Sequence, residues 1–233
     1  MNLIRLCDWE QEEEPFNRLD PAGNFLPLRP ITHQVEELSN EIASCIAPGG
    51  DEFSHPNAGL YDTAFYLISE IANNVRQHSK GQGYVTLQTT KTDGFIRIAI
   101  ADGGCGIPQS LSDAGLTWTQ ELSDEDIIEQ ALVARVTSKG QPANEGVGLT
   151  LTSQIVDLMG GHILIASNGG RVMRDYNMQP KKEPFDGGCC FPGTLVAMTF
   201  RRNEAEHFDE KLHKAKLLNN LLQSVTNQAT FRP

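Results

Sequence analysis

The sequence has few cysteines and no recognisable pairing among them. Its five cysteines form an odd set, and none lies in the paired C-x-x-C spacing of a zinc site. We therefore expect reduced thiols, with neither a disulfide framework nor a structural zinc ion. The adjacent Cys189 and Cys190 have no further ligands in the pattern, so we interpret them as incidental.

Long apolar runs, an export signal and positive charge are also lacking. No apolar stretch is long enough to cross a bilayer. The N-terminus, MNLIRLCDWEQEEE, lacks the basic region, apolar stretch and cleavage site of a secretory signal, so we expect a cytoplasmic protein without a membrane partner. The formal net charge of -11 repels a phosphate backbone, so we expect no nucleic-acid partner.

The length and composition of the sequence fit a protein with one substantial hydrophobic core. The chain has 233 residues, of which 39% are hydrophobic and 21% are charged. We expect an N-terminal acidic arm and helix over residues 1–55, a main domain over 56–202 and a C-terminal helical tail over 203–233. The prolines and acidic residues of the first 30 positions predict an extended arm.

Hydrophobic periodicity predicts the elements of the main domain. Apolar positions three or four residues apart indicate helices, and alternation indicates strands. Residues 170–192 are expected to be a loop insertion, and the small polar residues of 137–145 a mobile lid. The expected helices are 31–46, 61–78, 124–136, 149–158 and one after residue 201, and the expected strands are 84–89, 94–101, 162–166 and 195–200.

A polar row marks the second of these helices. Glu70, Asn74 and His78 are four residues apart, so their side chains lie on one face beside the apolar stripe. Such a row can line a pocket. Taken alone, the row is more often a solvated helix edge, so it does not decide between the two.

Two glycine-rich segments follow. Asp102 ends a strand and precedes Gly103-Gly104-Cys105-Gly106-Ile107, whose glycines allow close approach of a ligand or simply form a tight turn. The segment 145–149, Glu-Gly-Val-Gly-Leu, opens a helix where free amides favour phosphate. A lone Gly-x-Gly has little specificity, and neither a Rossmann fingerprint nor a Walker loop is present.

The order of these features resembles the GHKL superfamily of Bergerat-fold ATPases. The sequence has acid-x-x-x-amide on a helix, Asp-x-Gly-x-Gly after a strand, Gly-x-Gly opening a helix, and Gly193-Thr194 before a strand. The resemblance covers about residues 60–200. It implies an α/β (α+β) fold, a two-layer sandwich with a mixed, mostly antiparallel sheet covered on one face by helices. It also implies an ATP lid at about 108–148.

The resemblance also implies the roles of individual residues. Asn74 is implied as the Mg2+ ligand through its amide oxygen, and Glu70 as the general base. Asp102 is implied as the acceptor of a hydrogen bond from the adenine amino group, supported by Thr194. The other nucleotide-binding residues that the resemblance implies are His78, Gly104, Gly106, Ile107, Gly146, Val147, Gly148 and Leu149.

The sequence departs from several branches of this superfamily. Gln77 stands where many histidine kinases carry a basic residue that reaches the phosphates, and Lys139 or Arg76 are candidate substitutes. His33 lies in a segment similar to a phosphoacceptor box, but one short helix cannot form the acceptor hairpin, so we interpret it as a surface histidine. Only about 33 residues follow Phe200, too few for the transducer domain of gyrase-like and MutL-like enzymes.

The compact layout most resembles stand-alone bacterial ATP-binding proteins related to anti-sigma-factor serine kinases. This resemblance implies an Mg-ATP-dependent protein kinase or ATP hydrolase in signalling, with a protein partner, and it allows a homodimer. Glu70 would then activate a hydroxyl group of the partner. The alternative is an ATP-gated protein-binding switch in which no phosphate moves. The phosphate acceptor stays open at this point.

Overall fold

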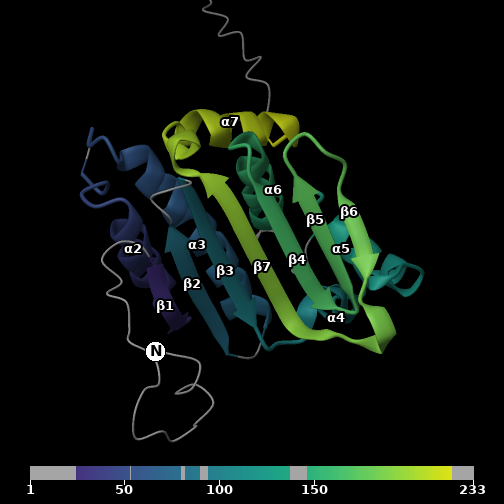
Figure 1. Cartoon of the computed structure of the whole chain (residues 1–233). Coiled ribbons are helices and arrows are strands. Elements are labelled where there is room, and N and C mark those ends of the chain that lie inside the picture. Colours follow the sequence, from purple (N-terminus) through teal and green to yellow (C-terminus); the bar gives the residue numbers. More distant parts are fainter. Residues whose placement is uncertain (1–24, 53, 80–81, 90–93, 137–145, 222–233) are drawn as a thin grey trace, which may run out of the picture.

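A computed structural model of the protein describes residues 25–52, 54–79, 82–89, 94–136 and 146–221. The expectations for the acidic arm before residue 25, for residues 137–145 of the lid and for the chain after residue 221 lie outside these residues. The described chain forms two layers, a sheet and a set of helices on one of its faces (Figure 1). The expected α+β sandwich is therefore confirmed.

Seven strands form the sheet in the order β1-β2-β3-β7-β4-β5-β6. All pairings between the described strands are antiparallel. The last strand in the chain, β7, lies in the middle of the sheet and joins β3 to β4. The strands are β1 (Phe25–Pro30), β2 (Gly83–Thr89), β3 (Phe95–Asp102), β4 (His162–Asn168), β5 (Gly170–Asp175), β6 (Lys181–Pro184) and β7 (Phe191–Arg201).

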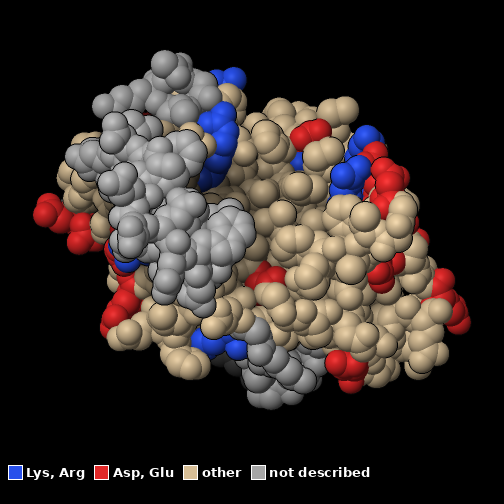
Figure 2. Space-filling model, turned by 60° about the horizontal axis from the view of Figure 1, so that its bottom comes forward, with Lys and Arg blue, Asp and Glu red and all other residues tan. Residues whose placement is uncertain are grey.

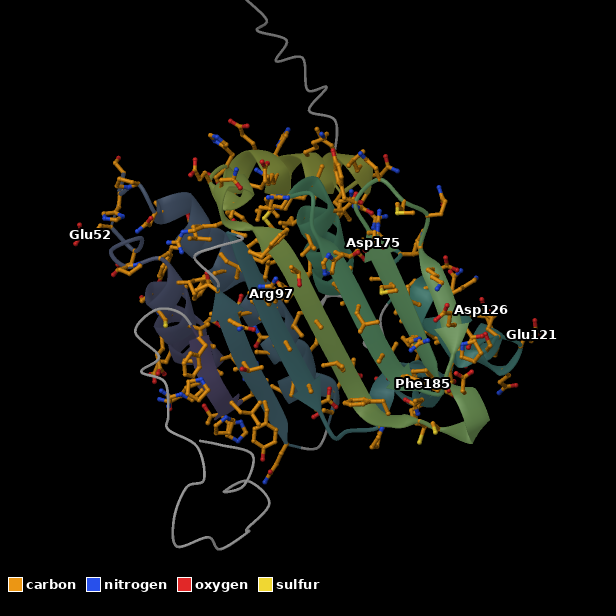
Figure 3. The ribbon with its side chains drawn as sticks, in the orientation of Figure 1. Glu52, Arg97, Glu121, Asp126, Asp175 and Phe185 are labelled. Atoms are coloured by element: carbon orange, nitrogen blue, oxygen red, sulfur yellow. The ribbon has the colours of Figure 1, made fainter. Side chains whose placement is uncertain are left out.

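Side-chain alternation decides which face of the sheet the helices cover. In β3, Ile96, Ile98 and Ile100 are buried, while the residues between them are only partly covered. Successive side chains of a strand point to opposite faces, so the isoleucines face the helices. Arg97 lies on the other face (Figure 3), with its guanidinium 5.5 Å from the centre of the Phe95 ring. The core therefore lies between the sheet and the helix layer.

The longest helix, α3, lies at the centre of the helix layer. Its apolar stripe, which includes Leu67, Ile68 and Ile71, is almost fully buried. None of the helices in the described ranges combines the length and the apolar character that a membrane crossing needs. The helices are α2 (Val35–Ile46), α3 (Ala58–His78), α4 (Gly106–Asp113), α5 (Asp124–Ala131), α6 (Gly148–Leu158) and α7 (Phe208–Leu218).

The last helix, α7, crosses one end of the helix layer (Figure 1). Its Phe208 ring lies 5.4 Å from the ring of Tyr66 on α3. Just before α7, the carbonyl of Ala205 accepts a hydrogen bond of 3.0 Å from the buried hydroxyl of Thr63. The C-terminal helix is therefore part of the same core as α3.

The expectation that residues 170–192 form a loop is wrong. This segment contains β5 and β6, which pair with each other beside β4, followed by a short 3-10 helix at Asp186–Gly188. Charged residues conceal the alternation in both strands. Arg171 and Arg174 interrupt the apolar residues of β5, and β6, the edge strand, exposes most of its side chains. Lysines such as Lys181 and Lys182 are typical of edge strands, where they discourage pairing with another chain.

Three expected boundaries also change. The helix expected from residue 31 begins at Val35, because the Ile31 amide donates to the Gly83 carbonyl and continues the strand pairing of β1. Residues 25–30 of the expected arm are that edge strand. The helix expected over 124–136 ends at Ala131, after which the chain tightens into turns with bonds three residues back.

Candidate functional site

A cavity of about 390 Å³ lies between α3, the ends of β3 and β7, α4 and the start of α6. Eleven of the twelve residues that the sequence singles out line it. The exception is Gly104, which is not part of the lining. The eleven are Glu70, Asn74, His78, Asp102, Gly106, Ile107, Gly146, Val147, Gly148, Leu149 and Thr194.

The cavity also has an apolar wall that sequence reasoning did not include. Ile71 and Val75 of α3, Leu111 of α4, Ala131 of α5 and Val196 of β7 line it. These residues belong to the same apolar stripes that build the core, so their pattern signals burial and gives no sign of a ligand. A flat, apolar ring system bound here would lie against this wall.

Glu70 reaches the cavity from the middle of α3. Its carboxyl group is half-buried, and this burial raises the pKa of Glu70 above its ordinary value. Tyr66 lies one turn earlier on the same helix. Burial, and in smaller part the charge of Glu70, raises the pKa of the Tyr66 hydroxyl. A carboxyl group with a raised pKa at a cavity wall is a suitable general base.

The raised pKa of Glu70 predicts a pH-dependent cost in stability. A carboxyl group whose pKa is higher in the folded than in the unfolded protein favours folding most at low pH, and this contribution is lost as pH rises through the folded-state pKa. Glu70→Gln, which stays neutral, is therefore expected to raise the thermal midpoint near pH 8 and to leave it unchanged near pH 4. An equal shift at both pH values would show that ionisation is not its cause.

Gly148, the first residue of α6, lies directly against this carboxylate. A Cβ atom placed on Gly148 would be 2.2 Å from Oε2 of Glu70, well inside van der Waals contact. The glycine therefore leaves the space that the carboxylate fills. Because a glutamate side chain is flexible, the carboxylate would move if the space were filled.

Gly148→Ala is expected to lower turnover by about 10-fold or more while the thermal midpoint stays within a few degrees. If Glu70 is the expected general base, the alanine displaces its carboxylate and thereby lowers the rate, whereas an alanine is itself favourable in a helix. Steady-state kinetics and a thermal melt measure the two effects. In a Glu70→Gln background the same change is expected to cost almost nothing further, and an equal additional loss would contradict this explanation.

Asp102 lies at the other end of the cavity, where β3 ends. It is 9% exposed, and its carboxylate accepts hydrogen bonds from the backbone amides of Gly104, at 2.8 Å, and Thr194. Burial raises the pKa of Asp102, while the two amides act in the opposite direction. The amides fix the carboxylate beside Thr194, whose side chain also lines the cavity.

Close packing explains why glycines follow Asp102, and the sequence alone did not reveal this packing. Gly106 has a φ of +80°, and a Cβ there would meet Oδ1 of Asn168 at 1.7 Å. A Cβ on Gly104 would meet the backbone of Ser79 at 2.1 Å. Gly104 therefore allows the loop to pack against the end of α3, and its amide holds Asp102 without touching the cavity itself.

The start of α6 brings backbone amides to the cavity. Gly146, Val147, Gly148 and Leu149 line the cavity where the backbone amides of an 11-residue helix begin. Free amides and the helix dipole make this a favourable place for an anion. Glu145, which precedes them, lies outside the described residues.

No lysine or arginine is among the described residues that line the cavity. Arg76 is not part of the lining, and Lys139 lies outside the described residues. Figure 2 shows the end of the molecule that carries α4, where basic side chains occur in small separate groups and uncharged residues cover most of the described surface. An anionic ligand in this cavity would need backbone amides or a bound cation to balance its charge.

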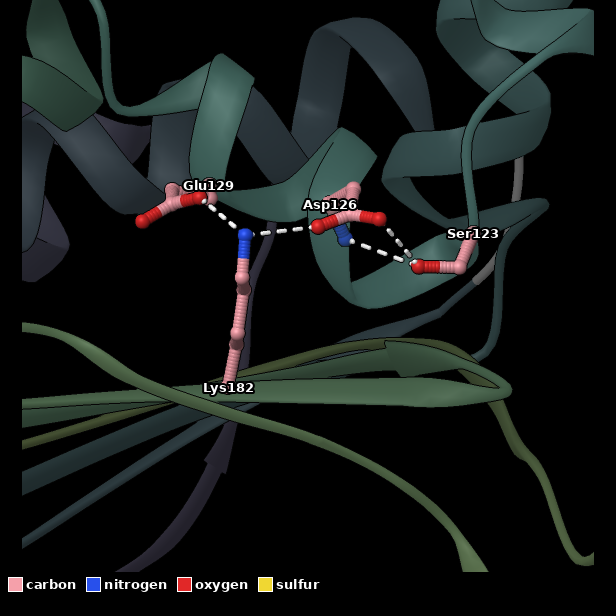
Figure 4. A network of polar contacts seen from close by, with 4 residues as sticks. All are labelled: Ser123, Asp126, Glu129 and Lys182. Carbon is pink, nitrogen blue, oxygen red and sulfur yellow. Dashed lines mark hydrogen bonds and ion pairs between the residues drawn. The ribbon is translucent and has the colours of Figure 1, made fainter.

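The short helix α5, which brings Ala131 to the cavity, is fastened to the β5–β6 hairpin. Lys182 of β6 donates to Asp126 and Glu129 of α5, each at 2.7 Å, and Ser123 caps the helix (Figure 4). The Asp124 carboxylate accepts a bond of 2.7 Å from the Gly169 amide at the turn between β4 and β5. The hairpin that the sequence did not predict therefore supports one wall of the cavity.

The metal site expected at Asn74 has no cluster of charged ligands around it. Among the described residues, no group of three or more histidine, cysteine, aspartate or glutamate side chains could hold a metal ion. Asn74 offers an amide oxygen at the cavity, which is a hard donor suited to Mg2+. Mg2+ characteristically takes one or two protein ligands together with phosphate oxygens and water, so this donor set fits a metal that arrives with a nucleotide.

Comparison with known proteins gives two findings. The family described as "Histidine kinase-, DNA gyrase B-, and HSP90-like ATPase" matches residues 59–197, which include every residue placed at the cavity above. The alginate biosynthesis sensor protein KinB of Pseudomonas aeruginosa is 29% identical over 114 residues, which are 49% of this chain and 16% of the relative. The chain thus spans about a sixth of that sensor protein.

Proposed function

The chain belongs to the family of histidine kinase-, DNA gyrase B- and HSP90-like ATPases, and we propose that it binds Mg-ATP in the cavity and transfers the terminal phosphate with Glu70 as general base. The observation that carries the proposal is the convergence of an acid, an amide, a buried carboxylate and a helix N-terminus on one cavity. Residues far apart in the sequence supply these groups, and each matches one part of the nucleotide.

The adenine is proposed to lie at the end formed by Asp102 and Thr194. Both side chains can accept a hydrogen bond from the amino group of the base, and the apolar wall that includes Val196 can cover the ring. Ile107, at the start of α4, lines the same end. A flat base that is held on its edge by a carboxylate and covered by apolar side chains is bound both specifically and tightly.

The triphosphate is proposed to lie between Asn74 and the start of α6. The amides from Val147 onward would hold the phosphates, and the amide oxygen of Asn74 would hold Mg2+. When bound, Mg2+ would neutralise charge on the phosphates, a need that no lysine or arginine among the described lining residues meets. His78, one turn after Asn74, also lines the cavity.

The chemical step is proposed to depend on Glu70. Its carboxylate, one turn before Asn74 on α3, would take the proton of the attacking hydroxyl group, and burial raises the pKa of Glu70, which makes it a stronger base. The attacking group is a protein hydroxyl or water.

We propose regulatory phosphorylation of a partner protein as the biological role. The relative in the comparison is named as a sensor protein, and the description of the matching family includes histidine kinases. The purified chain is to be incubated with gamma-labelled ATP and Mg2+, alone and with lysate of its own host. We expect a labelled partner protein or released phosphate. If neither product forms although ATP still binds, phosphate transfer is ruled out and the chain is instead an ATP-gated binding switch.

A further inference from the structure

Three side chains form a row across the end of the sheet. Asp102 of β3 pairs with Thr194 of β7, which pairs with Ser167 of β4. Ser167 lies in step with the buried Ile165 of the same strand, so the row faces the helix layer. Asp102 and Thr194 line the cavity, whereas Ser167 is 0% exposed and lies behind Thr194. No motif in the sequence singles out Ser167.

The hydroxyl of Ser167 lies at the centre of a polar cluster. The Ile107 amide donates to it at 2.8 Å, and it donates to the carbonyl of Gly193 at 2.7 Å. It also lies 3.3 Å from the hydroxyl of Thr194 and 3.2 Å from Oδ1 of Asn168. Ser167 therefore connects the start of α4 to the residues of β7 that flank the base-binding end.

A count of protons fixes the direction of these bonds. A serine hydroxyl has one proton and two lone pairs. The Ile107 amide can only donate and therefore occupies one lone pair, while the Gly193 carbonyl can only accept and takes the proton through the shortest bond. Oδ1 of Asn168, at 3.2 Å, is a second acceptor for the same Ser167 proton. Since both of these oxygens only accept, the 3.3 Å contact with Thr194, in which either hydroxyl could donate by geometry, is assigned as a bond from the Thr194 hydroxyl to the second lone pair of Ser167. The proton of Thr194 consequently points away from the cavity.

This arrangement leaves both Asp102 and Thr194 as acceptors at the base-binding end, which is the end of the cavity that they form. The Thr194 hydroxyl can offer just its lone pairs to a ligand, because its proton is committed to Ser167. Asp102 next to it is a carboxylate whose amide partners also leave it as an acceptor. A ligand that meets both groups must donate hydrogen bonds at this point.

We propose that Ser167 is a specificity-determining residue that makes this site select a 6-aminopurine nucleotide over a 6-oxopurine nucleotide. The inference rests on the proposed function, binding of ATP. Ser167 does not touch the base, and it acts by holding the proton of Thr194. A 6-oxo group would bring a third acceptor against Asp102 and Thr194, and such a mismatch costs affinity because a buried polar group loses its partner.

The test compares the dissociation constants of ATP and inosine triphosphate, which differ only at position 6 of the base and its neighbouring ring nitrogen. In Ser167→Ala the Thr194 hydroxyl can turn and donate to the 6-oxo group. We expect the wild-type preference for ATP to fall by about 3- to 10-fold. Loss of the Ile107 and Gly193 bonds can weaken both nucleotides, but a purely structural effect would leave their ratio unchanged.

Two further variants keep the test decisive. Thr194→Val removes the hydroxyl and is expected to lower the ATP preference by itself, even if Ser167→Ala does not fold. Adding Ser167→Ala to Thr194→Val is expected to leave the ratio unchanged. Equal preference in wild type and both single variants would overturn the inference while ATP binding stands. A wild-type protein that binds neither nucleotide would overturn the proposed function as well.

Discussion

Glu70→Gln is expected to reduce phosphate release or transfer by about 100- to 10,000-fold, while the dissociation constant for Mg-ATP changes only a few-fold. Glutamine keeps the size and one oxygen of the side chain but cannot take a proton. Glu70 lines the cavity one helical turn from Asn74, and burial raises the pKa of Glu70. Loss of the general base should therefore lower the reaction rate and hardly change the affinity for ATP.

The experiment needs the rate under saturating ATP and the affinity from a separate titration. Glu52→Gln is the matched control, because Glu52 is exposed at the edge of the molecule, away from the helix layer's cavity (Figure 3). The pH profile adds a second criterion. The wild-type rate should fall on the acid side with a midpoint above the ordinary glutamate value of 4.5, since burial raises the pKa of Glu70. An unchanged rate in Glu70→Gln would remove Glu70 from the mechanism.

Asp102→Asn is expected to weaken ATP binding by about 10- to 100-fold. A hydrogen bond to a charged group is worth about 1.5–3 kcal/mol, which corresponds to one to two decades in affinity. An asparagine retains one acceptor oxygen, but it loses the charge and places an NH2 group beside the amides of Gly104 or Thr194, which are donors themselves. The base-binding end would then lose its fixed acceptor.

A calorimetric titration of ATP into each variant measures this effect. Asp175→Asn is the matched control, because Asp175 is exposed at the end of β5 (Figure 3). Asp102→Asn should impair ATP more than it impairs inorganic triphosphate, which lacks the base. Equal titration curves for Asp102→Asn and wild type would show that the adenine of ATP binds elsewhere in the cavity.

The sequence was informative where one face of an element is buried. The apolar stripe of α3 and the alternation in β3 predicted both elements within a few residues of their observed bounds. The order of the motifs also suggested that Glu70, Asp102 and Gly148 belong to one site, and the fold brings them to one cavity. Their chemical roles stay predictions.

The sequence was uninformative where the pattern is carried by charge or by a single small side chain. The edge strand β6 exposes two lysines, and β5 carries two arginines and an aspartate, so both resembled a loop in the sequence, although β5 pairs with β4 and β6 pairs with β5. Ser167 is one serine at a strand end, and its importance comes from partners 60 and 26 residues away in the chain. Such long-range bonds leave no local signal.

The close packing of glycines is a second feature that only the structure reveals. Gly148 looked like part of a phosphate loop, but the space beside it is filled by the Glu70 carboxylate. Gly104 looked like a ligand contact, yet it lies against the end of α3 and supports Asp102 through its amide. Gly148 thus lets Glu70 of α3 lie against the start of α6, and Gly104 lets the loop that holds Asp102 lie against the end of α3.

The central claim, that this cavity binds Mg-ATP, is tested most directly by calorimetric titration of the purified chain with ATP in the presence of Mg2+. The account predicts one saturable site per chain with a dissociation constant of about 1 μM to 1 mM, weakened when Mg2+ is chelated and when Asp102 is replaced by asparagine. Absence of saturable binding at millimolar ATP, or binding that Asp102→Asn leaves unchanged, would contradict it.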